Sequence, residues 1–541
     1  MPTLTAPFKH PSLSHAPSDL IGGEWVPLTG RSDAAVVESL NPARPEQSVW
    51  SGRPVVGHVD AAVAAARAGF PAWARWGREK RFAVLRRFAD LCKQKAGAMA
   101  ELICDETGKV MWEAKGEAAA LSAKVDITLD LSPIGGLKRV DGFEFELGAG
   151  GGGGQKIGRA WFRPHGVMAV VGPFNFPAHL PNGHIVPALA MGNTVVFKPS
   201  DKAPGVGQML IELLAEALEK EGAPNKGRGI VNLVQGGGEI AAALTAHDGV
   251  EGILFTGSWP VGRKILAANL DRPSRIVALE MGGNNPVVVM EDADLRQAAV
   301  EIVRCAFNTT GQRCTCTRRV VAHARIADRL AAVIERASRA LTFGDPRGGT
   351  TGKTPTFAGP IITEAARRAV LDFQKAALAG GAEAVLASEP MAVRGGGFYL
   401  TPSVLRVKKF TADKTDPAID AGCDGEVFGP LLRLAEVRDL DEAIEQAGAT
   451  RYGLAASIFT RDQAAAERFM FECRAGCINI NAGTAGASSK LPFGGVGLSG
   501  NHRPAGSFML DACAYPVAAM IEKGQGAQLA EGMNWDEQWV R

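Results

Sequence analysis

The sequence predicts an α/β protein in which parallel sheets are covered by helices, and three observations support this fold class. Short apolar, β-branched runs, such as residues 167–172 and 194–198, end in or near Gly or Pro. Helical segments, among them Gly207–Glu219 and Glu239–Ala246, lie between these runs. A second series of the same kind follows from Leu295 to about Gly476. Because strands buried on both faces form continuous apolar runs, the alternation is typical of parallel sheets.

The chain before the first of these strands is expected to be mostly helical. From Asp60 to Glu117, apolar residues recur three and four positions apart with charges between them, which indicates amphipathic helices. The Gly-rich stretch 148–154 cannot hold one rigid conformation at low cost, so we expect a flexible hairpin tip or linker there. Residues 1–19 and 524–541 lack periodicity and are expected to be tails.

Composition and charge exclude several classes of function. The 541 residues are 46% hydrophobic and 21% charged, as in ordinary globular proteins, and this length suggests two or three domains. A formal net charge of +2 offers no field that would draw nucleic acid or an acidic membrane surface. No apolar run approaches the roughly 18–20 residues of a membrane span, and the N-terminus has no apolar core of a secretory signal. Nine scattered cysteines indicate a reducing compartment, so we expect a cytoplasmic protein.

The first candidate for chemistry is Cys314, in the segment NTTGQRCTC from Asn308 to Cys316. An adjacent Arg313 and a Gly- and Thr-rich turn suit an activated nucleophile, because positive neighbours favour the thiolate. The alternative is a small buried side chain, which is what most cysteines are. A metal site at Cys314 and Cys316 is disfavoured, because no second Cys/His pair has the spacing of a zinc site.

The second candidate is Glu280, which ends an apolar run and precedes Gly282 and Gly283. A carboxylate at the C-terminal end of a strand in an open α/β sheet lies where ligands bind. Apolar surroundings raise the pKa of such a carboxyl group and suit it to general-base catalysis. A turn-capping acid is the alternative.

Two further segments could bind a dinucleotide. Gly257 and Gly262 bracket a strand-to-helix turn of the kind that holds a pyrophosphate, although Arg263 and Lys264 break the Walker A pattern and make ATP hydrolysis unexpected. In FKPSD, residues 197–201, a Lys and an Asp that follow a strand could hold a ribose. An ordinary Gly-punctuated loop and a helix N-cap are the alternatives.

Taken together and in this order, eight short runs resemble the aldehyde dehydrogenase superfamily. Each run alone is weakly specific, but the complete set covers roughly Leu20 to Met520. The runs are Glu106-Thr-Gly-Lys109, Pro173-Phe-Asn-Phe-Pro177, Phe197-Lys-Pro-Ser200, Phe255-Thr-Gly-Ser258, Leu279-Glu-Met-Gly-Gly283, Gly311-Gln-Arg-Cys314, Glu426-Val-Phe-Gly-Pro430 and Pro492-Phe-Gly-Gly495.

The resemblance implies a role for each candidate. Cys314 is the expected nucleophile, Glu280 the base that activates water, and Asn175, with the Cys314 backbone N–H, the oxyanion hole. The expected cofactor is NAD, because an acid at Asp201 repels the 2′-phosphate of NADP. The expected cofactor-binding residues are Lys198, Ser200, Asp201, Gly257, Ser258, Gly262, Glu426 and Phe428.

The resemblance also implies the domain organisation: a Rossmann-like NAD-binding domain, a catalytic α/β domain and a small oligomerisation arm. We assign residues 20–147 and 166–281 to the first domain and 282–497 to the second. Residues 148–165 and 498–523 are assigned to the arm. The partners implied are a small-molecule aldehyde and further copies of the chain, as a homodimer or homotetramer.

Within the superfamily, the chain is similar to enzymes that oxidise the 5-semialdehyde of N-succinylglutamate in arginine breakdown. Two features support this similarity within the superfamily. They are Arg313 directly before the expected nucleophile and the run Asn501-His-Arg-Pro504. The two carboxylates of that substrate need cationic or donor partners, for which Arg313, His179 and Arg503 are candidates.

The chain departs from the family pattern after Asn481, where Ala482-Gly483 replaces an expected Lys-Pro. Because this segment lies near the substrate in the family, another semialdehyde, such as that of glutamate or succinate, remains an alternative. CoA acylation is disfavoured, because acylating members tend to lack the acid at Glu280. A catalytically silent dinucleotide-binding protein on the same fold is the alternative outside enzymes.

Overall fold

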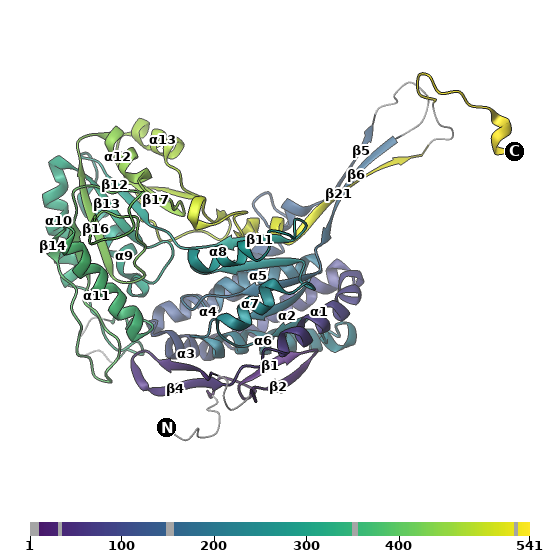
Figure 1. Cartoon of the computed structure of the whole chain (residues 1–541), viewed down its shortest axis with the longest axis horizontal. Helices are drawn as coiled ribbons and strands as arrows, with labels where there is room; N and C mark the ends of the chain where they lie inside the picture. The colour runs from purple at the N-terminus through teal and green to yellow at the C-terminus, as the bar shows by residue number, and fades with distance from the viewer. Residues whose placement is uncertain (1–9, 31–34, 148–155, 349–354, 524–528) are drawn as a thin grey trace.

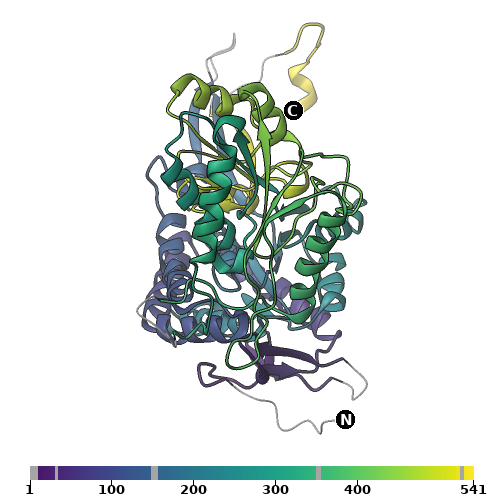
Figure 2. The ribbon, with the colours of Figure 1, turned by 90° about the vertical axis from the view of Figure 1, so that its left-hand side faces the viewer.

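The computed structural model describes residues 10–30, 35–147, 156–348, 355–523 and 529–541. Two seven-stranded sheets form separate lobes, and a narrow three-stranded arm projects from the molecule (Figure 1). Figure 2 shows the lobe of the second sheet from the side, with the N-terminal strands below it. Among the described residues, no helix has both the length and the apolar composition to cross a membrane.

The first sheet is parallel at its centre and antiparallel at one edge, in the order β11-β10-β7-β8-β9-β1-β2. The central strands β7, β8 and β10 are buried along their whole length, which explains why they form unbroken apolar runs. The strands are β1 (Ser18–Ile21), β2 (Glu24–Pro27), β7 (Val167–Val171), β8 (Thr194–Lys198), β9 (Val231–Leu233), β10 (Gly252–Thr256) and β11 (Ile276–Glu280).

Eight helices of the described chain belong to this lobe: α1, α5, α6 and α7 pack on the sheet, and the first four are the expected helical region. α4 begins after Val110 and packs on both α2 and α3. The helices are α1 (His58–Arg75), α2 (Arg78–Gln94), α3 (Ala96–Thr107), α4 (Met111–Thr128), α5 (His179–Met191), α6 (Pro204–Lys220), α7 (Gly238–Ala246) and α8 (Trp259–Ala267).

The second sheet has the order β14-β15-β16-β13-β12-β17-β18 and is parallel except for β14. Its strands are β12 (Asn285–Val289), β13 (Thr317–His323), β14 (Glu383–Leu386), β15 (Ser403–Arg406), β16 (Leu431–Val437), β17 (Ala455–Phe459) and β18 (Cys477–Ile480). Its helices are α9 (Leu295–Phe307), α10 (Ala324–Arg339), α11 (Glu364–Ala379), α12 (Leu440–Gly448) and α13 (Gln463–Glu472).

The two sheets meet edge to edge, and this arrangement creates the site. Glu280 ends β11 and Asn285 begins β12, so only residues 281–284 separate the C-terminal edge of one sheet from the N-terminal edge of the other. The segment before β13 carries Cys314, and the segment before β16 carries Glu426. Ligands of open α/β sheets bind at the C-terminal edge of the strands, and here the second sheet closes that edge.

The arm sheet has the order β21-β6-β5, formed by β21 (Ala514–Glu522), β6 (Lys156–Pro164) and β5 (Phe143–Leu147). It extends away from both lobes, and the C-terminus lies beyond its far end (Figure 1). The sequence assignment placed β5 in the first domain, but the structure pairs it along its whole length with β6. The expected Gly-rich hairpin tip at 148–154 lies outside the described residues.

The N-terminal segment differs from the expected tail. Residues 1–9 lie outside the described part, but from His10 onward the chain is packed against the body. Leu13 and Asp19 are buried, and Asp19 accepts a hydrogen bond from the His58 ring at 2.7 Å on α1. Periodicity could not reveal this packing, because the segment is held by contacts distant in sequence. The remaining short pairs are β3 (Val37–Asn41) with β4 (Arg44–Gly52) and β19 (Pro492–Phe493) with β20 (Ala505–Gly506).

Candidate active site

Cys314 lies in a turn between α9 and β13. Thr309, Thr310 and Gly311 all have left-handed backbone conformations, with φ of 52°, 55° and 72°. A side chain at Gly311 would overlap the Gly429 carbonyl, so only glycine allows this close approach. The turn brings Cys314 to a position where it lines two cavities, a large one of about 590 Å³ and a small one of about 230 Å³.

The surroundings of Cys314 favour the thiol over the thiolate. Burial raises the pKa of Cys314 above its usual range, and the nearby carboxylates of Glu280 and Glu426 raise it further. The sequence suggested that Arg313 would favour the thiolate, and this expectation is wrong for the structure shown. The Arg313 guanidinium donates to Glu113 instead, at 2.5 Å. A base must therefore remove the proton before the sulfur can attack.

Glu280 is a buried acid whose charge acts on Cys314. Its side chain is 1% exposed, and neither carboxylate oxygen has a hydrogen-bond partner among the described residues. Burial raises the pKa of Glu280 to about 8. Burial of an acid without hydrogen-bond partners costs folding free energy. Acids with such strongly shifted pKa values cluster at functional sites. The negative charge of Glu280 raises the pKa of both Cys314 and Cys477, so its carboxyl group lies near both thiols.

The glycines that follow Glu280 are required by close approaches. A side chain at Gly282 would overlap the Glu426 carboxylate. A side chain at Gly283 would lie 2.5 Å from the Asn285 Oδ1 and 2.8 Å from the Cys314 carbonyl. Residues 281–284, which connect the two sheets, thus pass between the Cys314 turn and the Glu426 segment. At Gly282 and Gly283 there is no room for a Cβ atom.

Asn175 lies in the loop between β7 and α5, opposite the nucleophile turn. It is buried, and its Nδ2 donates one hydrogen bond to the Gln312 carbonyl at 3.0 Å, which leaves its second N–H available. The Cys314 backbone N–H has no acceptor among the described residues. Two unused donors beside a nucleophile can stabilise the negative oxygen formed by attack on a carbonyl.

A buried ion pair holds the Asn175 loop, and the sequence analysis did not identify it. Lys109 Nζ donates to the Asn175 carbonyl at 2.7 Å and pairs with Glu117 of α4. Glu117 also accepts the backbone N–H groups of Ala178 and His179 at 3.0 and 3.1 Å. The signal present in the sequence was the pair Glu113 and Glu117, four residues apart on one face of a helix.

The large cavity combines most of the expected cofactor-binding residues. Burial lowers the pKa of Lys198 to about 8. Asp201 is half exposed and pairs with Lys202 at 3.3 Å. The lining includes Asn175, Lys198, Ser200, Asp201, Gly257, Ser258, Cys314, Glu426 and Phe428.

The turn between β10 and α8 fits a phosphate group. Gly257 leaves no space for a Cβ beside the Phe255 ring, and Gly262 leaves none beside the Met281 sulfur. Gly262 itself is not among the lining residues, because it lies on the buried face of α8 against Met281. The first residues of α8, Trp259, Pro260 and Val261, line the cavity, and the N-terminal end of a helix suits the pyrophosphate of a dinucleotide. A volume of about 590 Å³ is in the usual range for a ligand of that size.

Glu426 and Phe428 are held by a residue that sequence reasoning missed, Arg318. Its guanidinium donates to the carbonyls of Gly311 and Gly429, at 2.7 and 3.0 Å, and lies 5.6 Å from the centre of the Phe428 ring. Burial raises the pKa of the Glu426 carboxyl group, and Arg318 opposes this rise. Arg318 therefore ties the nucleophile turn to the segment that carries the cofactor residues.

The small cavity lies on the other side of Cys314. Of the three expected substrate residues, His179 and Arg313 line it and Arg503 does not. Arg503 is exposed and has a left-handed backbone. Burial lowers the pKa of His179, so its ring is neutral, and its Nδ1 has no partner among the described residues.

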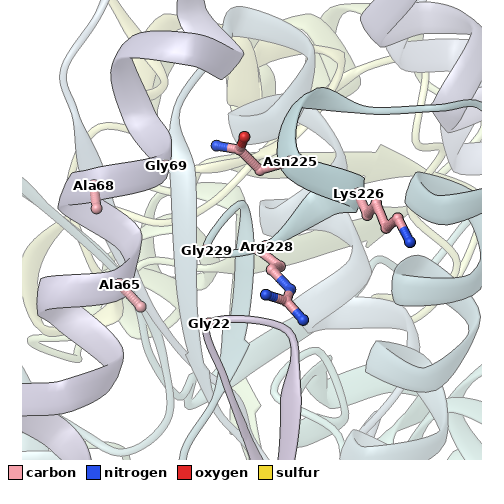
Figure 3. Close-up of a pocket in the computed structure, with 8 residues that line it drawn as sticks. All are labelled: Gly22, Ala65, Ala68, Gly69, Asn225, Lys226, Arg228 and Gly229. Carbon is pink, nitrogen blue, oxygen red and sulfur yellow. The ribbon is translucent and has the colours of Figure 1, made fainter.

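A third hollow, of about 580 Å³, lies on the outer surface between α1 and the turn before β9. Its walls are mostly glycine and alanine, and the side chains of Asn225, Lys226 and Arg228 extend in different directions (Figure 3). It contains no nucleophile or base. No group of three or more His, Cys, Asp or Glu side chains could hold a metal ion in the described part of the chain.

The fold and the site define a class: two-domain α/β oxidoreductases in which a cysteine lies between a dinucleotide-sized cavity and a smaller substrate cavity. The chain belongs to the aldehyde dehydrogenase family, whose model matches residues 29–516. The expected fold and the expected aldehyde-oxidising activity are thus confirmed.

The chain is similar to N-succinylglutamate 5-semialdehyde dehydrogenase 2 of Caulobacter vibrioides, at 42% identity over 503 residues, or 92% of this chain and 95% of the relative. It is 40% identical over 502 residues to an N-succinylglutamate 5-semialdehyde dehydrogenase of Chromobacterium violaceum, which covers 92% and 96%. An NAD-dependent aldehyde dehydrogenase from Sinorhizobium meliloti superposes with a TM-score of 0.83 at 28% identity, over 96% and 97%. The solved relatives include an NAD-dependent and an NADP-dependent enzyme. The cofactor of the family is therefore a nicotinamide dinucleotide, and the comparisons do not distinguish NAD from NADP.

Proposed function

We propose that the protein oxidises N-succinylglutamate 5-semialdehyde to N-succinylglutamate with NAD. The observation that carries the chemistry is the position of Cys314. It lines both cavities and lies near the buried Glu280 carboxylate, which has no hydrogen-bond partner among the described residues. The substrate assignment is supported by relatives of that activity at about 40% identity over nine-tenths of the chain.

The reaction begins when Glu280 takes the proton of Cys314 and releases it to solvent, and the sulfur adds to the aldehyde carbon. The carbonyl π electrons move to the oxygen, which accepts hydrogen bonds from Asn175 Nδ2 and the Cys314 backbone N–H. The hydride that leaves this carbon would be accepted by a nicotinamide dinucleotide bound in the large cavity. The C–O bond becomes a carbonyl again, and the acyl group remains on Cys314 as a thioester.

Glu280 carries the second half of the reaction. As a carboxylate it takes a proton from water, the oxygen of the water adds to the thioester carbon, and the C–S bond breaks. The products are the carboxylic acid and the Cys314 thiolate, which is then protonated again. A buried carboxylate without partners fits this role, because nothing in the described structure competes for its proton.

Binding of NAD would use the large cavity. Lys198, Ser200 and Glu426 are the candidates for the ribose groups, the turn at Gly257, Ser258 and Gly262 for the pyrophosphate, and Phe428 for the nicotinamide. NAD is preferred to NADP because the Asp201 carboxylate would repel a 2′-phosphate.

Substrate recognition would use the small cavity, where Arg313 and the neutral His179 face the space beside Cys314. Arg503 would have to act from the surface, where it is exposed. The arm would form the contact of a homodimer or homotetramer, supported by exposed apolar side chains at Phe143, Phe145 and Met520.

The experiment that tests the proposal is NADH formation by the purified protein with a panel of aldehydes. The panel contains N-succinylglutamate, glutamate and succinate semialdehydes and a simple aliphatic aldehyde, each with NAD and with NADP. The highest kcat/KM is expected for the succinylated substrate with NAD. A higher value for another semialdehyde would overturn the substrate assignment, and no turnover of any aldehyde would overturn the proposed activity.

A further inference from the structure

Lys124 is a buried cation on α4 that the reaction described above does not use. Its side chain belongs to a residue that is 3% exposed, and Nζ donates to the Gly506 carbonyl at 2.5 Å. Among the described residues, no carboxylate lies within ion-pair distance of this ammonium group. Because a buried charge without a counter-charge is strongly destabilising, such groups are usually paired or bind a ligand.

The neighbouring cations show how unusual this is. Lys109 pairs with Glu117, and Arg313 pairs with Glu113, and both carboxylates lie on the same helix as Lys124. Among these three cations, Lys124 is the one without a carboxylate partner in the described part of the chain.

The ammonium lies directly behind the wall of the small cavity. Gly506, its hydrogen-bond partner, lines that cavity together with His179 and Cys314. The positive charge of Lys124 contributes to the lowered pKa values of His179 and His184, so it lies close to both rings. The ring Nδ1 atoms of both histidines have no partner among the described residues.

The aliphatic stem of Lys124 packs against α5. A Cβ built at Gly183 would lie 3.7 Å from the Lys124 Cε, which is an ordinary van der Waals distance. Apart from the carbonyl of Gly506, the ammonium has donors in excess, since a lysine carries three N–H groups.

We propose that Lys124 is a specificity-determining residue whose charge selects aldehydes that carry a carboxylate, bound in the small cavity between His179 and Gly506. The inference rests on the proposed function and names the charge class of its substrate. Lys124 acts through the thin wall, where the low dielectric strengthens its attraction for an anion. It does not touch the aldehyde carbon, so a neutral aldehyde does not need it.

The test compares one substrate in charged and uncharged form. Steady-state kcat/KM is measured for N-succinylglutamate 5-semialdehyde and for its dimethyl ester in wild type, Lys124→Met, Lys124→Arg and the control Lys115→Met. Lys115 is on α4 like Lys124, but its side chain is exposed. We expect Lys124→Met to lower kcat/KM for the dianion by about 30-fold or more, the size expected when a buried charge partner is removed.

The dimethyl ester should change by less than about three-fold in Lys124→Met, and Lys124→Arg should retain most of the preference for the dianion. An equal loss for both substrates would mean that Lys124 only supports Gly506, and would overturn the inference. If Lys124→Met does not fold, Lys124→Gln replaces it, because an uncharged amide can still donate to Gly506. Wild-type charge selectivity in Lys124→Gln would also overturn the inference.

The wild type separates this inference from the proposed function. Equal kcat/KM values for the dianion and its ester would overturn the inference of charge selection. The proposed aldehyde dehydrogenase activity would still stand. Absence of turnover with every aldehyde would instead reject the proposed function.

Discussion

The Arg313 guanidinium donates to Glu113 at 2.5 Å, and these two residues come from different lobes of the protein. Glu113 lies on α4 in the first lobe, whereas Arg313 directly precedes Cys314 in the second lobe. The same Glu113 oxygen accepts a hydrogen bond from Thr309 at 2.9 Å, and Arg313 Nε donates to Thr309 at 2.8 Å. The nucleophile turn is thus fixed to a helix of the other lobe.

Glu113→Ala should therefore destabilise the protein and slow catalysis. Loss of one partner leaves the Arg313 charge nearly buried and unpaired, which costs about 3–5 kcal/mol in unfolding free energy. We expect kcat to fall about ten-fold or more as the turn loosens. Urea unfolding and steady-state kinetics measure the two effects. The exposed pair Arg339 and Glu335 provides the control, since Glu335→Ala should cost less than about 1 kcal/mol; an equally small effect of Glu113→Ala would contradict the prediction.

Cys314→Ala should abolish aldehyde oxidation while binding of NADH, followed by its fluorescence, is retained. The sulfur forms the covalent bond on which both half-reactions depend, and the small change in volume leaves the large cavity intact. Cys92→Ala is the matched control, because Cys92 is a buried cysteine in the first-lobe core. Measurable turnover by Cys314→Ala would exclude it as the nucleophile.

Glu280→Gln should form about one NADH per active site and then stall. An amide cannot accept the proton of the attacking water, so the thioester accumulates. Rapid-mixing absorbance at the NADH band, followed by mass measurement of the intact protein, detects both the burst and the acyl group on Cys314. Steady-state turnover at the wild-type rate would show that another group is the base.

The rate of thioester hydrolysis should increase with pH and level off above about 8. The pKa of Glu280 is raised to about 8 by burial, so below this pH most of the molecules carry the protonated acid, which cannot accept a proton. Each unit of pH below the pKa should lower the rate about ten-fold. Single-turnover hydrolysis of the acyl-enzyme between pH 6 and 9.5 measures this profile. A rate that is independent of pH over this range would contradict the assignment of Glu280.

Asp201→Ala should narrow the preference for NAD over NADP. The change removes the charge that repels a 2′-phosphate and leaves Lys202, its partner at 3.3 Å, free to attract one. The ratio of kcat/KM for NAD and NADP should fall by about ten-fold or more. Lys202→Ala is the matched variant and should change the ratio in the opposite direction. An unchanged ratio in Asp201→Ala would show that Asp201 does not determine the choice between NAD and NADP.

Local sequence determined the strands and the order of the chemical groups. The runs that became β7, β8, β10 and β11 were recognisable because strands buried on both faces tolerate few polar residues. Cys314 and Glu280 could each be singled out from a short motif, because Gly residues mark the turns that carry them, whereas Asn175 was assigned only through the family resemblance. These signals depend on neighbours within a few residues and are therefore visible in one dimension.

The tertiary structure alone decided what holds and tunes these groups. Three contacts join residues that are not adjacent in sequence. They are the ion pairs Arg313–Glu113 and Lys109–Glu117 and the hydrogen bond from Arg318 to the Gly429 carbonyl. The thiol pKa of Cys314 was expected to fall beside Arg313, yet burial and two acids raise it. Burial and charge pairing depend on which distant segments meet, and the hydrophobic pattern of one segment does not encode its partners. For the same reason β5 joined the arm and residues 10–19 packed on the body, although neither segment showed a local signal for these contacts.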